Sequence, residues 1–101
     1  MPKGYWVAHV TVDDPAAYDA YRQANAAAFQ KYGGRFLVRG GEARVAEGAM
    51  PGRTVVIEFP TVQAAHACYD SPEYRRAMAL RLPCSTADLA IFAGWDAPDH
   101  D

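Results

Sequence analysis

The chain has 101 residues, of which 50% are hydrophobic and 12% aromatic, and its formal charge is −2 at pH 7. This length is typical of a single domain, and this composition excludes a disordered chain. The slightly acidic balance argues against a nucleic-acid partner, because nucleic-acid binders usually carry a basic face.

The first expected strand covers residues 4–12, which are rich in aromatic and β-branched side chains. Both alternating faces of this segment carry bulky residues, so we expect a central strand that is covered on both sides. A helix follows, with Asp14 as its cap, Pro15 at its first position and Gly33 at its end. The inward stripe of this helix is predicted to contain Tyr18, Tyr21, Asn25, Ala28, Phe29 and Tyr32.

Two further strands are expected in the middle of the chain. The first covers residues 35–39 and continues through residues 42–46, with a bulge or close backbone approach at the paired glycines Gly40 and Gly41. The second covers residues 54–59 and ends at Pro60.

The last third of the chain predicts a helical segment and a final strand. Thr61 caps a helix that runs to about residue 69, and Ser71 with Pro72 restarts it through about residue 82. The final strand is expected over residues 88–95.

The resulting order, β-α-β-β-α-β, predicts a ferredoxin-like α+β domain over residues 1–96, with a frayed tail over residues 97–101. Two helices cover only one face of a four-stranded antiparallel sheet, yet the strands show little polar alternation. We therefore expect a homodimer in which a second copy of the chain covers the other face.

Short motifs occur along most of the chain: Gly4-Tyr5-Trp6, Asp14-Pro15 with Tyr18 and Tyr21, Tyr32 to Gly41, Val56 to Pro60, Ser71-Pro72-Glu73-Tyr74, Arg81 and Asp88-Leu89. Together they resemble the domain-of-unknown-function family numbered 1330. The resemblance implies a dimeric α/β barrel, in which two ferredoxin-like sheets pack face to face. That superfamily includes cofactor-free monooxygenases, muconolactone isomerase-like enzymes, chlorite dismutase-like haem proteins and ligand-sensing domains. The final strand and Cys84 depart from the family pattern, so no site residue is carried over there.

The strongest polar constellation is Glu58, Arg81 and Arg39. Glu58 ends the third strand, and Arg81 shares a helical stripe with Tyr74 that should face the sheet. A charge on an apolar stripe must be paired or must border a cavity. We expect a cleft in which Arg81 and Arg39 bind an anion and Glu58 acts as base, or a structural ion pair between Glu58 and Arg81, or an Arg81 side chain that reaches solvent at the helix end.

His9 lies on a core strand, where it can serve as a general base or as a hydrogen-bonded structural histidine. The helical tyrosines Tyr18, Tyr21, Tyr69 and Tyr74 are expected either in the core, with hydroxyls in contact with water, or as the lining of the cleft. Asn25 is unusual on an inward stripe and could reach the same cleft.

No metal or cofactor is expected. His66 and Cys68 point about 200° apart on a helix, His100 lies in the tail, and the chain contains neither CxxC nor HxxxH. Two cysteines are too few for a disulfide framework. With no leader and no apolar run near 18 residues, we expect a cytoplasmic protein without a membrane partner.

Three hypotheses about function remain open at this level. The first is a small cofactor-free enzyme of the monooxygenase or isomerase kind. The second is a binding or sensing module for a small anionic or aromatic molecule, and the third is a structural dimer whose cleft is filled. The same strand order occurs in RNA-binding domains, but residues 54–59 lack their basic-aromatic signature.

Overall fold

The computed structural model describes residues 2–96, so the tail predicted over residues 97–101, with His100, lies outside the described residues. The elements follow the predicted order, with the second helical segment divided at Ser71. They are β1 (Gly4–Val12), α1 (Pro15–Tyr32), β2 (Arg35–Arg39), β3 (Arg53–Phe59), α2 (Val62–Asp70), α3 (Pro72–Arg81), a 3₁₀ turn (Leu82–Cys84) and β4 (Ser85–Ala93).

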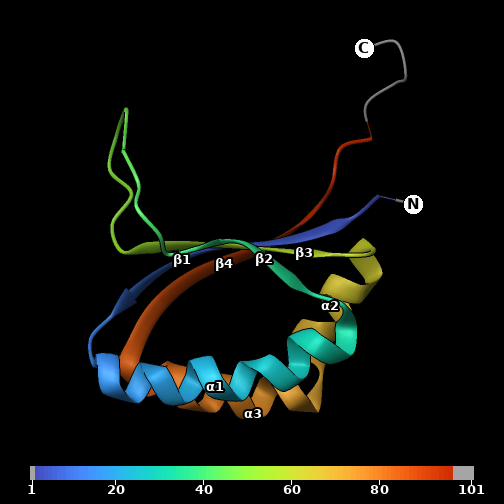
Figure 1. Ribbon diagram of the computed structural model, residues 1–101, viewed down its shortest axis with the longest axis horizontal. Coiled ribbons are helices and arrows are strands. Elements are labelled where there is room, and N and C mark those ends of the chain that lie inside the picture. Colours follow the sequence, from blue (N-terminus) through green and yellow to red (C-terminus); the bar gives the residue numbers. More distant parts are fainter. Residues whose placement is uncertain (1, 97–101) are drawn as a thin grey trace.

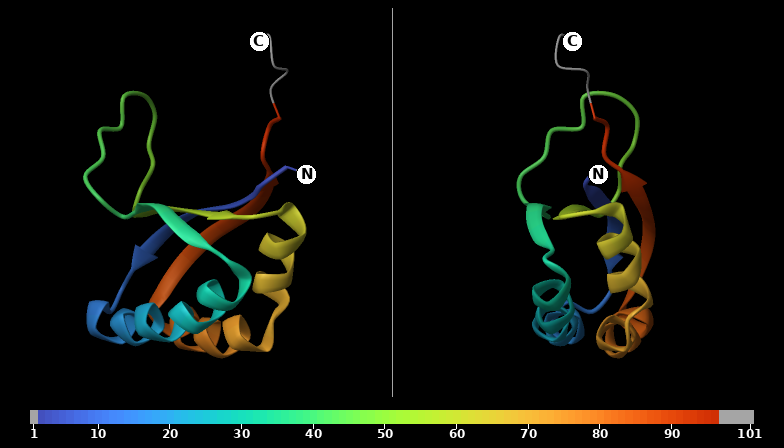
Figure 2. Two further views of the ribbon diagram at one scale, coloured as in Figure 1. Left: turned by 45° about the vertical axis from the view of Figure 1, so that its right-hand side comes forward. Right: turned by 90° about the vertical axis from the view of Figure 1, so that its right-hand side faces the viewer.

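The strands form one antiparallel sheet in the order β2-β3-β1-β4. All three α-helices lie on the same side of this sheet, with α1 and α3 next to each other (Figures 1 and 2). The predicted ferredoxin-like fold and the central place of β1 are therefore confirmed.

The predicted helix boundaries rest on local capping chemistry. The Asp14 side chain accepts a hydrogen bond from the Ala17 N–H at 3.2 Å, and Pro15 follows it at the first helical position. Gly33 ends α1 with φ 75°, a left-handed conformation that favours glycine.

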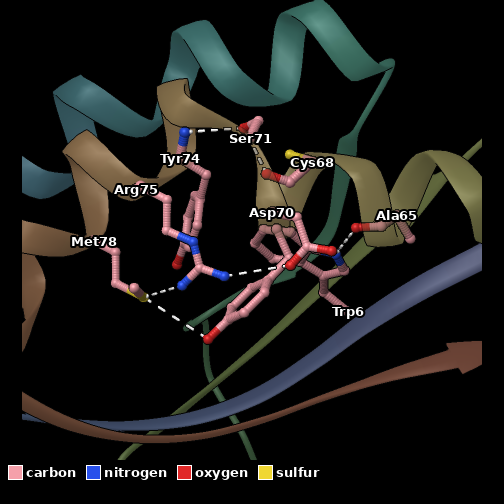
Figure 3. A network of polar contacts seen from close by, with 9 residues as sticks. Trp6, Ala65, Cys68, Asp70, Ser71, Tyr74, Arg75 and Met78 are labelled. Atoms are coloured by element: carbon pink, nitrogen blue, oxygen red, sulfur yellow. Dashed lines mark hydrogen bonds and ion pairs between the residues drawn. The ribbon is translucent and has the colours of Figure 1, made fainter.

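Ser71 separates α2 from α3 and serves both helices (Figure 3). Its hydroxyl oxygen accepts from the Tyr74 N–H at 3.1 Å, and its O–H donates to the Cys68 carbonyl at 2.7 Å. The chain thereby turns sharply between two helices without leaving these buried backbone groups unpaired.

Two predicted strand boundaries are wrong. Residues 42–46 form no strand, because the whole segment 40–52 is exposed and turns at Gly40, Gly48 and Gly52, which all have positive φ. β4 begins at Ser85 rather than residue 88, because its polar first residues extend the pairing with β1 as far as Val12.

β2 contains a bulge at Leu37 rather than at the glycines. Phe36 lies opposite Ile57 and Val38 opposite Val56, so two steps along β2 match one step along β3. The extra residue reverses the alternation of side chains, and Arg39 comes to lie opposite Val55 on the helix side of the sheet.

Trp6 is the centre of the core between sheet and helices. Its side chain is 2% exposed, and its indole N–H donates to the Ala65 carbonyl at 2.9 Å (Figure 3). The rings of Phe29 and Tyr74 contact it edge-on, with centroids at 5.2 and 4.9 Å. These contacts join β1, α1 and α3 into one packed unit.

The other face of the sheet is largely uncovered by the described chain (Figure 1). It presents half-buried or exposed side chains, among them Tyr5, Val7, His9, Val56 and Phe92. The 40–52 segment and the chain after β4 both extend on this side, and residues 49–51 border a pocket there together with His9 and Asp88.

Candidate functional site

A narrow cavity lies between the sheet and helices α1 and α3. Its volume is about 30 Å³, enough for about two water molecules. Apolar side chains of β1, β3 and β4 form its floor, and the aromatic side chains of α1 and α3 form its roof. The residues central to its chemistry are Tyr18, Tyr21, Asn25, Tyr74 and Arg81.

Arg81 contributes a buried positive charge to this cavity. It lies in the last turn of α3, it is 7% exposed, and its Nε has no hydrogen-bond partner among the described residues. Its guanidinium carbon lies 5.8 Å from the centre of the Tyr21 ring, and no described carboxylate forms an ion pair with it. Burial acts to lower the pKa of Arg81, but the Tyr74 and Tyr21 hydroxyls outweigh this effect, so the group remains charged.

The hydroxyls of Tyr21 and Tyr74 form a hydrogen bond of 2.9 Å beside Arg81. Burial raises the pKa of Tyr21 well above its ordinary value, so this hydroxyl stays neutral. Only one of the two hydroxyl protons lies between the oxygens, and the other can be donated to a ligand.

Asn25 lies one helical turn after Tyr21, so both side chains are on the same face of α1. The residue is 4% exposed, and its Oδ1 finds no hydrogen-bond donor among the described residues. The Asn25 amide contacts the Tyr21 hydroxyl, while its unpaired Oδ1 borders the cavity.

Three further arginines surround the cavity. Arg39 lies 4.1 Å over the ring of Phe36, and Arg53 donates to the Arg39 carbonyl at 3.2 Å. Arg22 is the third, and together with Arg81 it makes four guanidinium groups, while no carboxylate or imidazole lines the cavity. The walls are therefore apolar and aromatic, and the electrostatic potential is positive.

An open groove of about 490 Å³ adjoins the cavity beside β4. It shares Arg81, Ala87 and Leu89 with the cavity and is also lined by Tyr69 and Met78. Tyr69 therefore borders the same arginine from outside, and its hydroxyl donates to the Met78 sulfur at 3.8 Å. The groove provides room for a body larger than the cavity itself holds.

Glu58 lies on the opposite face of the sheet from Arg81, so the predicted convergence of these two residues on one pocket is wrong. Ile57 and Phe59 point into the core, and strict alternation sends Glu58 the other way. It accepts hydrogen bonds from Tyr5 at 3.1 Å and Arg35 at 3.0 Å. The alternative of a structural ion pair between Glu58 and Arg81 is excluded for the same reason.

Lys3 also approaches Glu58, at 3.5 Å. Partial burial acts to raise the pKa of Glu58, but hydrogen bonds from Tyr5 and Arg35 outweigh it and hold the pKa below its ordinary value. The carboxylate is thus ionised and well satisfied, which is typical of a structural role rather than of a general base.

His9 also lies on the face of the sheet away from the helices. Its Nδ1 is 3.1 Å from the Thr54 hydroxyl, and Asp88 stands opposite it on β4. The predicted site residues therefore divide into two groups. Arg81, Arg39, Tyr18, Tyr74 and Asn25 share the cavity, whereas His9 and Glu58 do not reach it.

Sequence reasoning missed Arg53 and Arg22 as cavity residues. For Arg53 the signal was present, because it shares the alternation of Val55 and Ile57, which face the helices. Tyr21 was placed correctly on the inward stripe of α1. Its hydrogen bond with Tyr74 depends on the packing of two helices, so no sequence pattern predicts it.

Neither a membrane-spanning helix nor a cluster of metal ligands is found within residues 2–96. No helix there is long and apolar enough to span a bilayer. No three of the His, Cys, Asp and Glu residues in this part come together as ligands for a metal ion.

The chain matches one protein family and is similar in fold to several solved structures. The family model of the Domain of unknown function (DUF1330) matches residues 3–95. A protein of unknown function from Rhodopseudomonas palustris is similar at 19% identity and a TM-score of 0.73, over 95% of this chain and 85% of that one. SnoaB, a cofactor-independent oxygenase from Streptomyces nogalater, is similar at 19% identity and a TM-score of 0.62, over 98% and 99%.

A dimeric ferredoxin-like protein of unknown function from Thermobifida fusca is similar at 20% identity and a TM-score of 0.52, over 91% of each chain. At these identities the likeness shows the ferredoxin-like fold. The search of curated proteins found no match.

Proposed function

The chain belongs to the family of the domain of unknown function DUF1330, and we propose that it is a cofactor-independent oxygenase that binds a small aromatic anion in its sheet–helix cavity and the adjoining groove. One observation carries the proposal: Arg81 is a buried cation without a counter-charge, and it faces a cavity with aromatic walls. An uncompensated buried charge destabilises a fold by several kcal/mol. A bound anion would supply the missing partner.

The same charge can activate a substrate without a basic side chain. A phenol or enol bound beside Arg81 has its pKa lowered, because a nearby cation favours the ionised form. The resulting delocalised anion is electron-rich enough to react with O₂ directly. When an activated CH₂ becomes a carbonyl, one oxygen atom enters the product and the other leaves as water. The fold shared with a cofactor-independent oxygenase supports this chemistry.

The test is a panel of phenols and enolisable ketones that carry an activated CH₂ group, with and without an acid group. Oxygen uptake is followed with an electrode, and mass spectrometry with isotope-labelled O₂ identifies the product. We expect uptake that stops with Arg81→Met and continues with Arg76→Met, a matched change at an exposed position of α3. Binding without oxygen uptake would contradict the oxygenase and leave a non-catalytic binding module.

We also infer that the chain forms a homodimer through the face of the sheet away from the helices. The half-exposed Val7 and Val56 lie opposite each other at the centre of that face, and Phe92 is 52% exposed. A dimer that is stable at micromolar concentration should bury more than about 1,000 Å² in total. A dimeric protein with the same fold supports this arrangement.

Light scattering checks the dimer directly, since one chain has a mass of 11.0 kDa. Val56→Lys should give monomers, because it places a charge at the centre of the contact. Leu80→Lys, at an exposed position of α3, should leave the dimer intact. A wild-type monomer at micromolar concentration would overturn the inference.

The redox state of the cysteines is relevant to the cellular compartment of the protein. Cys68 and Cys84 are both buried and free, which supports the cytoplasmic location expected from the sequence. Recovery of the native protein with an intramolecular disulfide would contradict it.

A further inference from the structure

We propose that the preferred ligand is an aromatic acid that carries a hydroxyl group, and that Asn25 is the residue that selects for this hydroxyl. This inference rests on the proposed function, because it specifies what the anion in the same cavity must look like. It follows from the hydrogen-bonding capacity that the described residues leave unused.

The cavity offers one unused acceptor. Oδ1 of Asn25 is buried without a partner, and an amide oxygen can only accept hydrogen bonds. A plain carboxylate has no proton to give and would leave this oxygen unpaired. A ligand that satisfies Asn25 must therefore bring an O–H or N–H of its own.

The cavity also offers unused donors. Nε–H of Arg81 has no partner, and the Tyr21–Tyr74 pair has one spare hydroxyl proton. Guanidinium groups donate only, so this side of the cavity needs an anionic acceptor. The pattern of donors and acceptors is therefore matched in full neither by a simple anion nor by a simple alcohol.

Both requirements lie within the reach of one small molecule. Asn25 is one helical turn from Tyr21, and the guanidinium of Arg81 is 5.8 Å from the centre of the Tyr21 ring. Side chains one turn apart are separated by about 5–6 Å between their Cβ atoms. The cavity of about 30 Å³ has room for the acid and hydroxyl groups of such a molecule, and its aromatic ring lies in the adjoining groove beside Met78, which also borders Arg81.

Calorimetric titration of the intact protein with benzoate and with 2-, 3- and 4-hydroxybenzoate tests this inference. Each hydroxybenzoate is compared with its methoxy counterpart, which keeps the acid and the oxygen but loses the donor. We expect at least one hydroxybenzoate to bind about tenfold more tightly than benzoate and than its methoxy form. Asn25→Leu should reduce that preference to about one, while the exposed Gln30→Leu on the same helix should preserve it.

The outcomes separate this inference from the proposed function. If benzoate binds in an Arg81-dependent way but no hydroxyl improves binding, the role of Asn25 is refuted and the anion site stands. If no aromatic acid binds at all, both fail. If Asn25→Leu does not fold, the comparison of hydroxy and methoxy ligands on the wild-type protein still decides the question.

Discussion

Replacing Arg81 by methionine should leave the fold nearly as stable and remove anion binding. Methionine has a similar length and fills the same space. Since no described carboxylate pairs with Arg81, the change does not strand a partner, an event that costs about 3–5 kcal/mol. What is lost is its contact with the Tyr21 ring at 5.8 Å, an interaction of about 0.5–1 kcal/mol.

The expected loss in the free energy of unfolding is therefore at most about 1 kcal/mol. The variant also no longer buries an unpaired cation, and this gain in stability offsets part of the loss. For a domain of this size such a change shifts the melting temperature by no more than about 4–8 °C. Binding of an aromatic acid should weaken by about 1.5–3 kcal/mol, the value of hydrogen bonds to a charged group. This corresponds to about a 10- to 150-fold rise in Kd.

A thermal melt and a calorimetric titration with benzoate measure the two effects on the same sample. Arg76→Met is the matched control, because it makes the same chemical change at an exposed position of α3 and should alter neither quantity. A fall of 3 kcal/mol or more in the free energy of unfolding, with binding unchanged, would refute the reasoning. It would show that Arg81 is held by a structural partner rather than kept for a ligand.

Three other predictions concern the rest of the molecule. Burial raises the pKa of Cys68 to about 12, so in the folded protein its thiol should react with a disulfide reagent at pH 8 only at the rate of unfolding; rapid labelling would contradict this. Because hydrogen bonds lower the pKa of Glu58 below its ordinary 4.5, its contribution to stability is present above that pH and is lost as the pH falls through the folded value. Glu58→Gln should therefore flatten the acid side of the stability profile measured by urea unfolding, and an unchanged profile would count against the network. Gly4→Ala should destabilise the fold by about 1–3 kcal/mol in a thermal melt, since a Cβ there would lie 2.7 Å from the Cα of Val62; an unchanged melt would show that α2 moves freely away from β1.

The parts of the fold that sequence reasoning predicted correctly are those fixed by short-range chemistry. Asp14 followed by Pro15, Ser71 followed by Pro72, and Gly33 after a helical stripe each determine a helix end from neighbouring residues alone. The order of elements then follows, and with it the ferredoxin-like fold.

The incorrect predictions mostly concern features that depend on residues far apart in the sequence. The start of β4 depends on how far β1 extends as its pairing partner, and no residue near Ser85 indicates that Ser85 pairs with Val12. Glu58 was assigned to the cavity from its place at a strand end, although the alternation with Ile57 and Phe59 was available to exclude it. The absence of a partner for Nε of Arg81 and Oδ1 of Asn25 among the described residues cannot be predicted from sequence, because it depends on every side chain that packs around them.

The bulge at Leu37 makes the charge of the cavity sensitive to the length of one strand. Deletion of Leu37 would restore regular pairing and leave Arg39 opposite Val55 on the helix side, whereas one extra residue between Val38 and Arg39 would turn the guanidinium to the opposite face. Insertion of one codon in this edge strand therefore offers a route by which descendants of the chain can exchange one ligand for another in a single genetic event. Such a step changes the site without any substitution among the residues that line it.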